Sequence, residues 1–560
     1  MTLTDPSRND RWLTRIRLQF LAGGFLGGWV LAAGLEFFRW EGITRLPGWE
    51  VRWAAAFLAV WTLLSPGTAG SILTTLRNRF RFSRDAPSPK LILPPWGLAA
   101  LGAAGGALWW ELPGTFFMTA AFLIGFRSVL RRLPPGERTS LSRLISLALA
   151  TRLLFIFVYY PLASFMGWTA AWLTLDVPPV LVPVLFGDGV DALSLSRAWA
   201  LYWRGDWVSP AEFAEIANPD RSLFSIHGDV RHLLPPALLF FVFGVEMIGA
   251  RVLSSVATVC AAVIAYFTLR GRFGVRAAWC AAALLAFWPT LFSWSLDALK
   301  EPYFLLLLIA SAWFTERFSR EGGWRPMAAS LVMLGLALSV RTRWFPPIAF
   351  TAVICLGGWV IRKALHRFSR VRQAACGALV LGLLIGGVFA WPAGRRLVYY
   401  YSHQSVSAQR SFALHYGNGY KVWPAEYYTR STNDFPIIFK WRDAAWANLK
   451  NLGHVMFEPF PRWWGGRGWK GAAFFLLAVP WWIVVGLAGV GGGVIAFRND
   501  GMGWIYLVYT SVTLAFLATF SGNVGTLIRH RDSVSPILLM IAAVGVSAVW
   551  ERLRPGESRG

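Results

Sequence analysis

The sequence predicts an all-α polytopic membrane protein with about 14 transmembrane helices and two long extracytoplasmic loops. Hydrophobic residues make up 56% of the 560 residues, and the mean hydropathy is +0.48. Apolar runs close to membrane-spanning length recur along the whole chain, and basic residues fill every second loop between them. These observations together favour a chain that crosses a membrane many times.

The apolar runs set the expected spans, and the first is too long for a signal peptide, so we expect it to be retained. Interfacial tryptophans, of which the chain has 32 in all, fit the ends of such spans. The candidate spans lie at residues 17–38, 51–66, 91–110, 114–130, 141–161, 250–269, 277–290, 299–315, 326–341, 345–361, 374–391, 471–497, 502–521 and 534–550.

The basic loops set the expected orientation, because Lys and Arg accumulate on the cytoplasmic side of membrane proteins. This alternation places both termini in the cytoplasm. It also accounts for the net charge of +25 without nucleic-acid binding, which we do not expect. The basic segments lie at residues 8–17, 77–90, 131–138, 270–276, 317–325 and 362–372.

Four parts follow from this topology. Residues 1–140 hold additional N-terminal helices, and residues 141–391 form a membrane core that includes the first outer loop at 162–249. A second outer loop spans residues 392–470, and C-terminal helices follow at 471–560. Both loops contain carboxylates, aromatic residues and turn residues, so we expect the chemistry of the protein there.

The first outer loop contains LFGDGVDALSLSRAW, in which Asp188 and Asp191 are three residues apart. On a helix that begins here, the two carboxylates share one face. They are candidates for a general base or for metal ligands; ordinary capping of the helix start is the alternative. The sequence identifies no certain cofactor and leaves a divalent metal open.

A second acidic group follows in SWSLDALKEPYF, where Asp297, Lys300 and Glu301 stand at the outer entry of a span. Lys300 is expected either to pair with one of the two carboxylates or to help surround the head group of a substrate. Asp297 and Glu301 would then support that site rather than react.

Cations at other outer ends break the expected charge bias. They are Arg341 and Arg343 in SVRTRWFPP, and Arg529, His530 and Arg531 in TLIRHRDSVSP. Charged groups near membrane depth are costly, and a phosphate would offset that cost because Arg binds phosphate with two hydrogen bonds. We therefore expect these groups, with Lys300, to bind the phosphate of a membrane lipid, and Asp532 to orient an arginine.

Several stretches in this order resemble a known layout: LLFIFVYY, GDGVDALSLSRAW, RGDW, LLPPALLFFVFG and GTLIRHRDSVSPILL. The chain from about 141 to 550 resembles the GT-C superfamily of membrane glycosyltransferases, which includes dolichyl-phosphate-mannose protein mannosyltransferases and lipid A aminoarabinose transferases. Counted back from Gly205–Trp207, the acidic pair of that family falls on Val190 and Asp191. Asp188 supplies a second carboxylate one turn earlier, so the base is Asp191 or Asp188.

The resemblance implies an inverting transferase that moves a sugar from a polyprenyl-phosphate donor to a glycan, lipid or protein acceptor. It implies an inner or plasma membrane of bacterial type, with the active site on the extracytoplasmic face. Two alternatives remain: a polysaccharide polymerase or ligase that uses undecaprenyl-linked glycans, and a transporter of lipids or solutes. The donor distinguishes the first alternative, and repeats with broken helices near the midplane are typical of the second.

Overall fold

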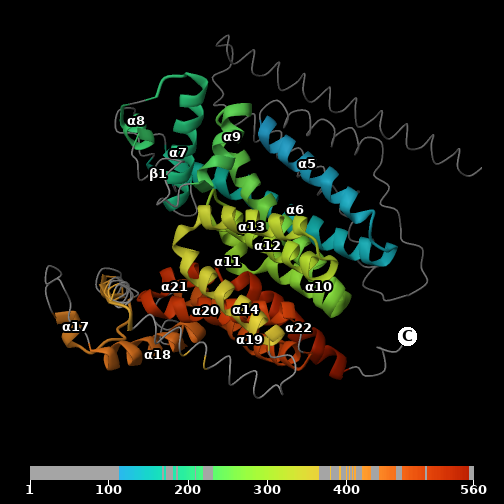
Figure 1. Cartoon of the computed structure of the whole chain (residues 1–560). Coiled ribbons are helices and arrows are strands. Elements are labelled where there is room, and N and C mark those ends of the chain that lie inside the picture. The colour runs from blue at the N-terminus through green and yellow to red at the C-terminus, as the bar shows by residue number, and fades with distance from the viewer. Residues whose placement is uncertain are drawn as a thin grey trace, which may run out of the picture.

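The computed structural model describes residues 112–166, 169–171, 181–183, 187–208, 210–217, 231–364, 419–429, 440–461, 469–498 and 501–553, with scattered positions between 379 and 411. The spans predicted at 17–38, 51–66 and 91–110, and most of the one at 374–391, lie outside the described residues. The described part is almost entirely helical (Figure 1).

Nine long helices of the described part coincide with predicted spans. Six of them contain stretches long and apolar enough to cross a membrane, so the chain is an integral membrane protein; the total of about 14 stays a prediction. The nine are α5 (Pro113–Leu130), α6 (Pro135–Phe165), α10 (Met247–Phe287), α12 (Glu301–Glu321), α13 (Trp324–Val340), α14 (Phe345–Ala364), α19 (Trp469–Arg498), α20 (Gly501–Phe520) and α22 (Ser535–Leu553).

Helix α10 joins the two spans predicted at 250–269 and 277–290. The basic segment between them stays helical until Gly274, where φ is +83° and the helix changes direction. Glycine adopts a positive φ without a steric penalty, so it permits this break. The long helix lies at the centre of the molecule, packed against α5, α6, α12 and α22.

The first outer loop corrects the all-α prediction in one detail. Strands β1 (Thr169–Ala171) and β2 (Leu181–Pro183) pair antiparallel, with Ala170 opposite Val182. Such pairing satisfies backbone groups that a proline-rich segment cannot place in a helix. The short helices of this loop are α7 (Gly187–Arg204), α8 (Pro210–Ala217), η1 (Arg231–Leu233) and α9 (Leu234–Phe243).

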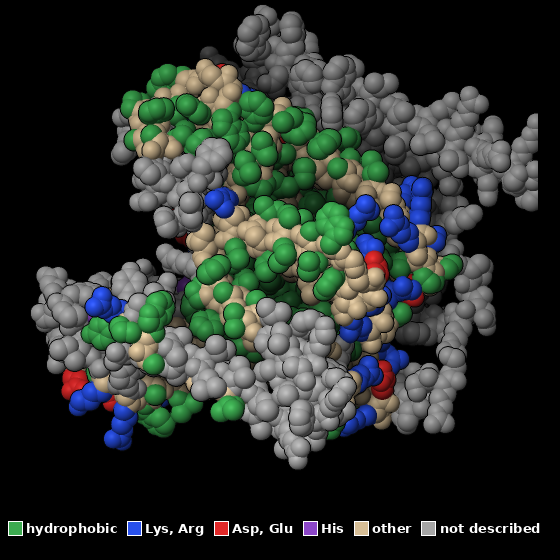
Figure 2. All heavy atoms as spheres, viewed as in Figure 1, with side chains coloured by type: hydrophobic (Ala, Val, Ile, Leu, Met, Phe, Trp, Pro, Cys, Tyr) green, Lys and Arg blue, Asp and Glu red, His purple; other side chains and the backbone are tan. Residues whose placement is uncertain are grey.

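Five more short elements connect or flank the long helices. They are α11 (Pro289–Ser295), η2 (Thr342–Trp344), α17 (Glu426–Thr429), α18 (Trp441–Phe457) and α21 (Val524–Arg531). In Figure 1, α7, α8, α17 and α18 lie toward the same end of the helices, at the left. Figure 2 shows many Lys and Arg side chains gathered at the opposite end, at the right. The described part therefore has one end built of outer-loop elements and one basic end.

Close helix packing explains one glycine of the GVGGG stretch (Gly489–Gly493), namely Gly491. A Cβ atom added to Gly491 on α19 would collide with the carbonyl of Ile541 on α22. A Cβ atom added to Gly545 would likewise collide with the carbonyl of Leu487. The two backbones approach this closely only because both helices carry glycine at the contact.

Candidate functional site

Glu301 lies at the centre of a charged cluster at the N-terminal end of α12. Its side chain is buried, and its Oε1 accepts hydrogen bonds from Arg529 Nε at 2.8 Å and from Arg341 Nη2 at 3.2 Å. A buried carboxylate needs such counter-charges, and the N-terminal turn of a helix favours it further. We call Glu301, Arg341, Arg529 and Asp188 the outer cluster.

Arg529, on α21, divides its guanidinium between two carboxylates. Its Nη1 donates to Asp188 Oδ2 at the start of α7, while Nε faces Glu301. The guanidinium carbon also lies 5.7 Å from the centre of the Trp294 ring. Burial lowers the pKa of Arg529, but Glu301 and Asp188 outweigh burial and raise that pKa above its usual value. Arg529 therefore stays a cation, and the cluster opens to solvent at Asp188, whose side chain is 61% exposed.

Arg341, directly after α13, forms the buried side of the cluster. Its side chain is 4% exposed, and its guanidinium carbon lies 5.7 Å from the Phe304 ring centre and 5.8 Å from that of Trp344. Its Nη1 donates to Ser533 Oγ. Arg529 and Ser533 both belong to the C-terminal motif TLIRHRDSVSP. This motif therefore supplies one arginine of the cluster and contacts the other, Arg341.

Asp297 fixes the start of α7 beside the cluster. The carboxylate is fully buried, accepts a 2.9 Å hydrogen bond from the Ala298 amide, and lies 3.6 Å from Arg251 Nε. A Cβ atom added to Gly189 would overlap this carboxylate, so only glycine lets the α7 backbone come this close. The contact between Gly189 and the Asp297 carboxylate thus sets the position of the neighbouring Asp188.

Residues 236–391 match the family model of the dolichyl-phosphate-mannose-protein mannosyltransferases. This segment therefore carries a GT-C superfamily domain, which confirms the resemblance that the sequence predicts. It contains Asp297, Glu301 and Arg341 and supports a membrane glycosyltransferase. No curated protein and no solved structure gives a significant match to the chain.

Arg531 lies on the other side of α21, away from the outer cluster. Its Nη2 donates to the carbonyl of His454 at 2.8 Å, and its Nη1 donates to that of Glu458. These carbonyls end α18, and the guanidinium carbon lies 4.7 Å from the Trp481 ring centre. Arg531 thus caps α18 in this structure, and its predicted role in phosphate binding gains no support from these contacts.

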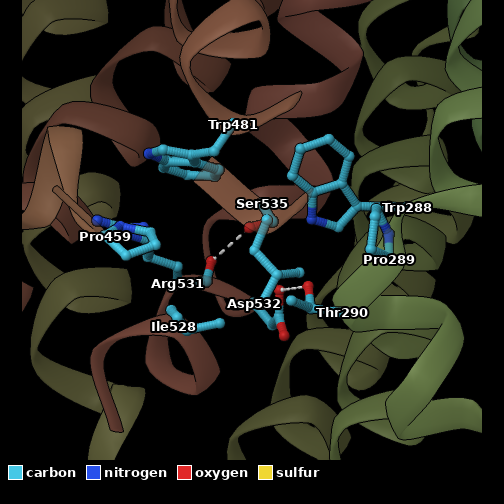
Figure 3. Close-up of a pocket in the computed structure, with 10 residues that line it drawn as sticks. Trp288, Pro289, Thr290, Pro459, Trp481, Ile528, Arg531, Asp532 and Ser535 are labelled. Atoms are coloured by element: carbon cyan, nitrogen blue, oxygen red, sulfur yellow. Dashed lines mark hydrogen bonds between the residues drawn. The ribbon is translucent and has the colours of Figure 1, made fainter. Parts of the chain in front are cut away.

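A small pocket of about 20 Å³ lies on this side of α21 (Figure 3). Trp288 and Trp481 flank it, and Asp532 reaches its rim, where Thr290 Oγ1 donates to Asp532 Oδ1 at 2.6 Å. Burial raises the pKa of Asp532 to about 7. Trp294 Nε1 also donates to Asp532, and the ring centre of Trp294 lies 5.7 Å from the guanidinium carbon of Arg529, so the predicted orienting role of Asp532 stays a prediction.

The remaining predicted site residues lie around the outer cluster without joining its described ion pairs. Asp191 is exposed on α7, one turn after Asp188, and His530 follows Arg529 on α21, half-buried. Lys300 precedes Glu301 at the α12 N-cap. The side chain of Arg343 lies outside the described residues. Their proposed roles stay predictions.

Two buried arginines inside predicted spans contact the segment that carries Asp297, and neither was predicted from the sequence. Arg152 on α6 donates from Nε to Ser295 Oγ at 2.8 Å and from Nη2 to the Ala286 carbonyl at 2.7 Å, bracing α11. Arg251 on α10 lies 3.5 Å from the Tyr160 ring centre, beside Asp297. A charged residue within an apolar span usually has a functional or structural role, and this rule alone identifies both arginines from the sequence.

Four aromatic side chains of the second outer loop pack inside the protein. Tyr420, Trp423, Tyr427 and Tyr428 are each 8% exposed or less. Tyr420 stacks on His454 with ring centres 4.0 Å apart. These side chains therefore hold the loop together.

The described residues contain no candidate metal site, because no three His, Cys, Asp or Glu side chains among them lie close enough together to hold an ion. The predicted metal ligands, Asp188 and Asp191, are both exposed. The outer cluster instead offers two guanidinium groups, which suit an anion.

Proposed function

We propose that the chain transfers a sugar from a polyprenyl-phosphate donor to an acceptor on the extracytoplasmic face of the membrane. One observation carries the proposal: Arg529 links the exposed carboxylate of Asp188 to a buried Glu301–Arg341 pair. An open carboxylate beside two phosphate-binding side chains is the combination that such a transfer requires. The family match over 236–391 supports the same class of reaction.

The two ends of the molecule support the proposed orientation. Arginine-rich loops occupy one end, and Lys and Arg favour the cytoplasmic side of short loops. The outer cluster lies at the other end of α12, beside α7 and α21, so we assign it to the extracytoplasmic face. Both termini then lie in the cytoplasm, in an inner or plasma membrane of bacterial type.

In the proposed reaction, Asp188 takes the proton of an acceptor hydroxyl, with Asp191 as the alternative base. The acceptor oxygen attacks the anomeric carbon of the sugar from the side opposite the phosphate, which inverts that carbon. The bond from this carbon to the phosphate oxygen breaks, and the electron pair stays on the phosphate. Arg529 and Arg341 hold the charge that develops there, because guanidinium groups bind phosphate oxygens in pairs.

The decisive experiment supplies purified protein in lipid nanodiscs with polyprenyl-phosphate sugars labelled in the sugar, together with glycan, lipid and protein acceptors. The proposal predicts transfer of the label by the wild-type protein. A parallel reaction uses glycans linked through pyrophosphate. Transfer from the pyrophosphate donor alone would replace the proposal by a polymerase or ligase, and no transfer from any donor would refute it.

A further inference from the structure

Arg529, the arginine on the solvent-facing side of the outer cluster, is already hydrogen-bonded to a carboxylate. Arg529 Nη1 donates to Asp188 Oδ2, so the proposed base sits on a group that the proposed lipid phosphate needs. The contact lies at the open side of the cluster: the Arg529 side chain is 24% exposed and that of Asp188 61%. An incoming phosphate meets this pair before it reaches Glu301 or Arg341.

The charges of the four residues in the outer cluster favour the departure of one carboxylate. Asp188 and Glu301 carry two negative charges, and Arg341 and Arg529 carry two positive charges, so the cluster is neutral. A phosphodiester with one negative charge gains little from a neutral cluster. When one carboxylate withdraws, the remaining groups carry one positive charge, which matches the donor.

The structure distinguishes the carboxylate that can leave from the one that cannot. Glu301 is buried and bonded to both arginines, so moving it would leave buried charges without partners. Asp188 is mostly exposed and can turn into water at little cost, because exposed ion pairs contribute little to stability.

We propose that Asp188 acts as an internal occupant of the phosphate site, which the phosphate of the donor displaces from Arg529. The base is thereby released only when a donor is bound. This inference rests on the proposed function and adds an order to it: donor phosphate first, proton transfer second.

The same pair serves at the end of the reaction. Asp188 receives the acceptor proton and becomes neutral, while the phosphate oxygen keeps the electron pair of the broken bond. Asp188 then gives its proton to water and regains its charge. The carboxylate returns to Arg529 Nη1 and displaces the lipid phosphate product, which restores the neutral cluster.

The test measures the affinity for polyprenyl phosphate without a sugar, which binds but cannot react. Wild type, Asp188→Asn and Asp206→Asn are compared in nanodiscs, with thermal unfolding as the check on folding. Asp206 is an exposed aspartate beyond the other end of α7, so it controls for the loss of one negative charge. We expect Asp188→Asn to bind about two- to fivefold more tightly, as an exposed ion pair allows. Asp206→Asn should match wild type.

Arg529→Gln supplies the second half of the test. The gain from Asp188→Asn should vanish in this background, because the carboxylate no longer has an arginine to occupy. A gain that persists without Arg529 overturns the displacement, as does an Asp188→Asn protein that binds no more tightly than wild type. If wild type itself does not bind polyprenyl phosphate, the proposed function fails as well, so the two failures are distinguishable.

Discussion

Helix α12 carries a buried glutamate near each end, and each glutamate lies between two arginines. Glu301 meets Arg341 and Arg529, as described above. Glu316 lies 2.5 Å from Arg272 Nε and 2.9 Å from Arg320 Nε. The two glutamates are fifteen positions apart, or about 22 Å along the helix.

The two clusters differ in where their partners come from and in what lies beyond them. Arg320 is four residues from Glu316 on the same helix, and Arg272 comes from the neighbouring α10. The arginines of Glu301 come from 40 and 228 positions away, and one of them continues to the exposed Asp188. A buried ion pair alone therefore does not mark a site, and the proposed site is based on the chain of charges that reaches the exposed Asp188.

The largest difference between the two ends of α12 is expected when the exposed carboxylate of Asp188 is neutralised. Asp188→Asn should lower the rate of sugar transfer by about 10²- to 10⁴-fold, the usual contribution of a general base. The unfolding temperature should stay close to that of wild type, because Asp188 is exposed. Glu321→Gln, which removes an exposed carboxylate at the other end of α12, should change the rate by less than about twofold. Equal rates in both variants would remove Asp188 from the reaction.

The arginines should differ in stability as well as in role. Arg341→Met removes a buried partner of Glu301, which keeps only Arg529, and should cost about 1.5–3 kcal/mol of unfolding free energy. Arg320→Met removes a 44% exposed partner and should cost less than about 1 kcal/mol, since Glu316 keeps Arg272. Denaturant unfolding in detergent micelles measures both. Similar losses would mean that the two clusters are energetically alike.

The position of Asp188 depends on the close contact beneath it. Gly189→Ala places a methyl group against the Asp297 carboxylate and should shift the first turn of α7. A displacement of about 1 Å in a reacting group can cost roughly a hundredfold in rate, so we expect a loss of up to that size. Gly125→Ala on α5, where nothing lies within 4 Å of the added atom, is the matched control. Full activity of Gly189→Ala in the transfer assay would show that the contact does not position the base.

A close contact far from both clusters gives the reference for purely structural packing. Gly491→Ala should destabilise the α19–α22 pair by about 1–3 kcal/mol and leave the catalytic rate unchanged. Gly493→Ala on the same helix meets nothing within 4 Å, and alanine there should be neutral or slightly stabilising. Equal decreases in the unfolding free energy of the two variants would contradict this interpretation.

The sequence predicts the helices and the individual charges of the outer cluster well. Apolar length placed α5, α13 and α22 within a few residues, because the membrane thickness fixes the length of a span. Arg341 and Arg529 are candidates because cations at outer ends are costly and break the usual bias. Asp188 is a candidate base because of its spacing to Asp191, and Glu301 is a candidate supporting residue. The structure adds that these four are in contact.

The sequence could not predict which of the clustered cations face one another. Arg529 and Arg531 are two positions apart on α21, and such residues point about 200° apart around a helix. One therefore faces Glu301, while the other meets the end of α18. Local patterning also could not reveal that Arg251 pairs with Asp297, because that contact depends on how α10 packs against the loop after α11.

The central claim is that the outer cluster binds the phosphate of a polyprenyl lipid. An experimental structure of the protein with polyprenyl phosphate bound tests it most directly. We predict that phosphate oxygens lie within hydrogen-bonding distance of Arg529 and Arg341, with Asp188 turned away from Arg529. A phosphate bound elsewhere, with the Asp188–Arg529 contact intact, would contradict the claim.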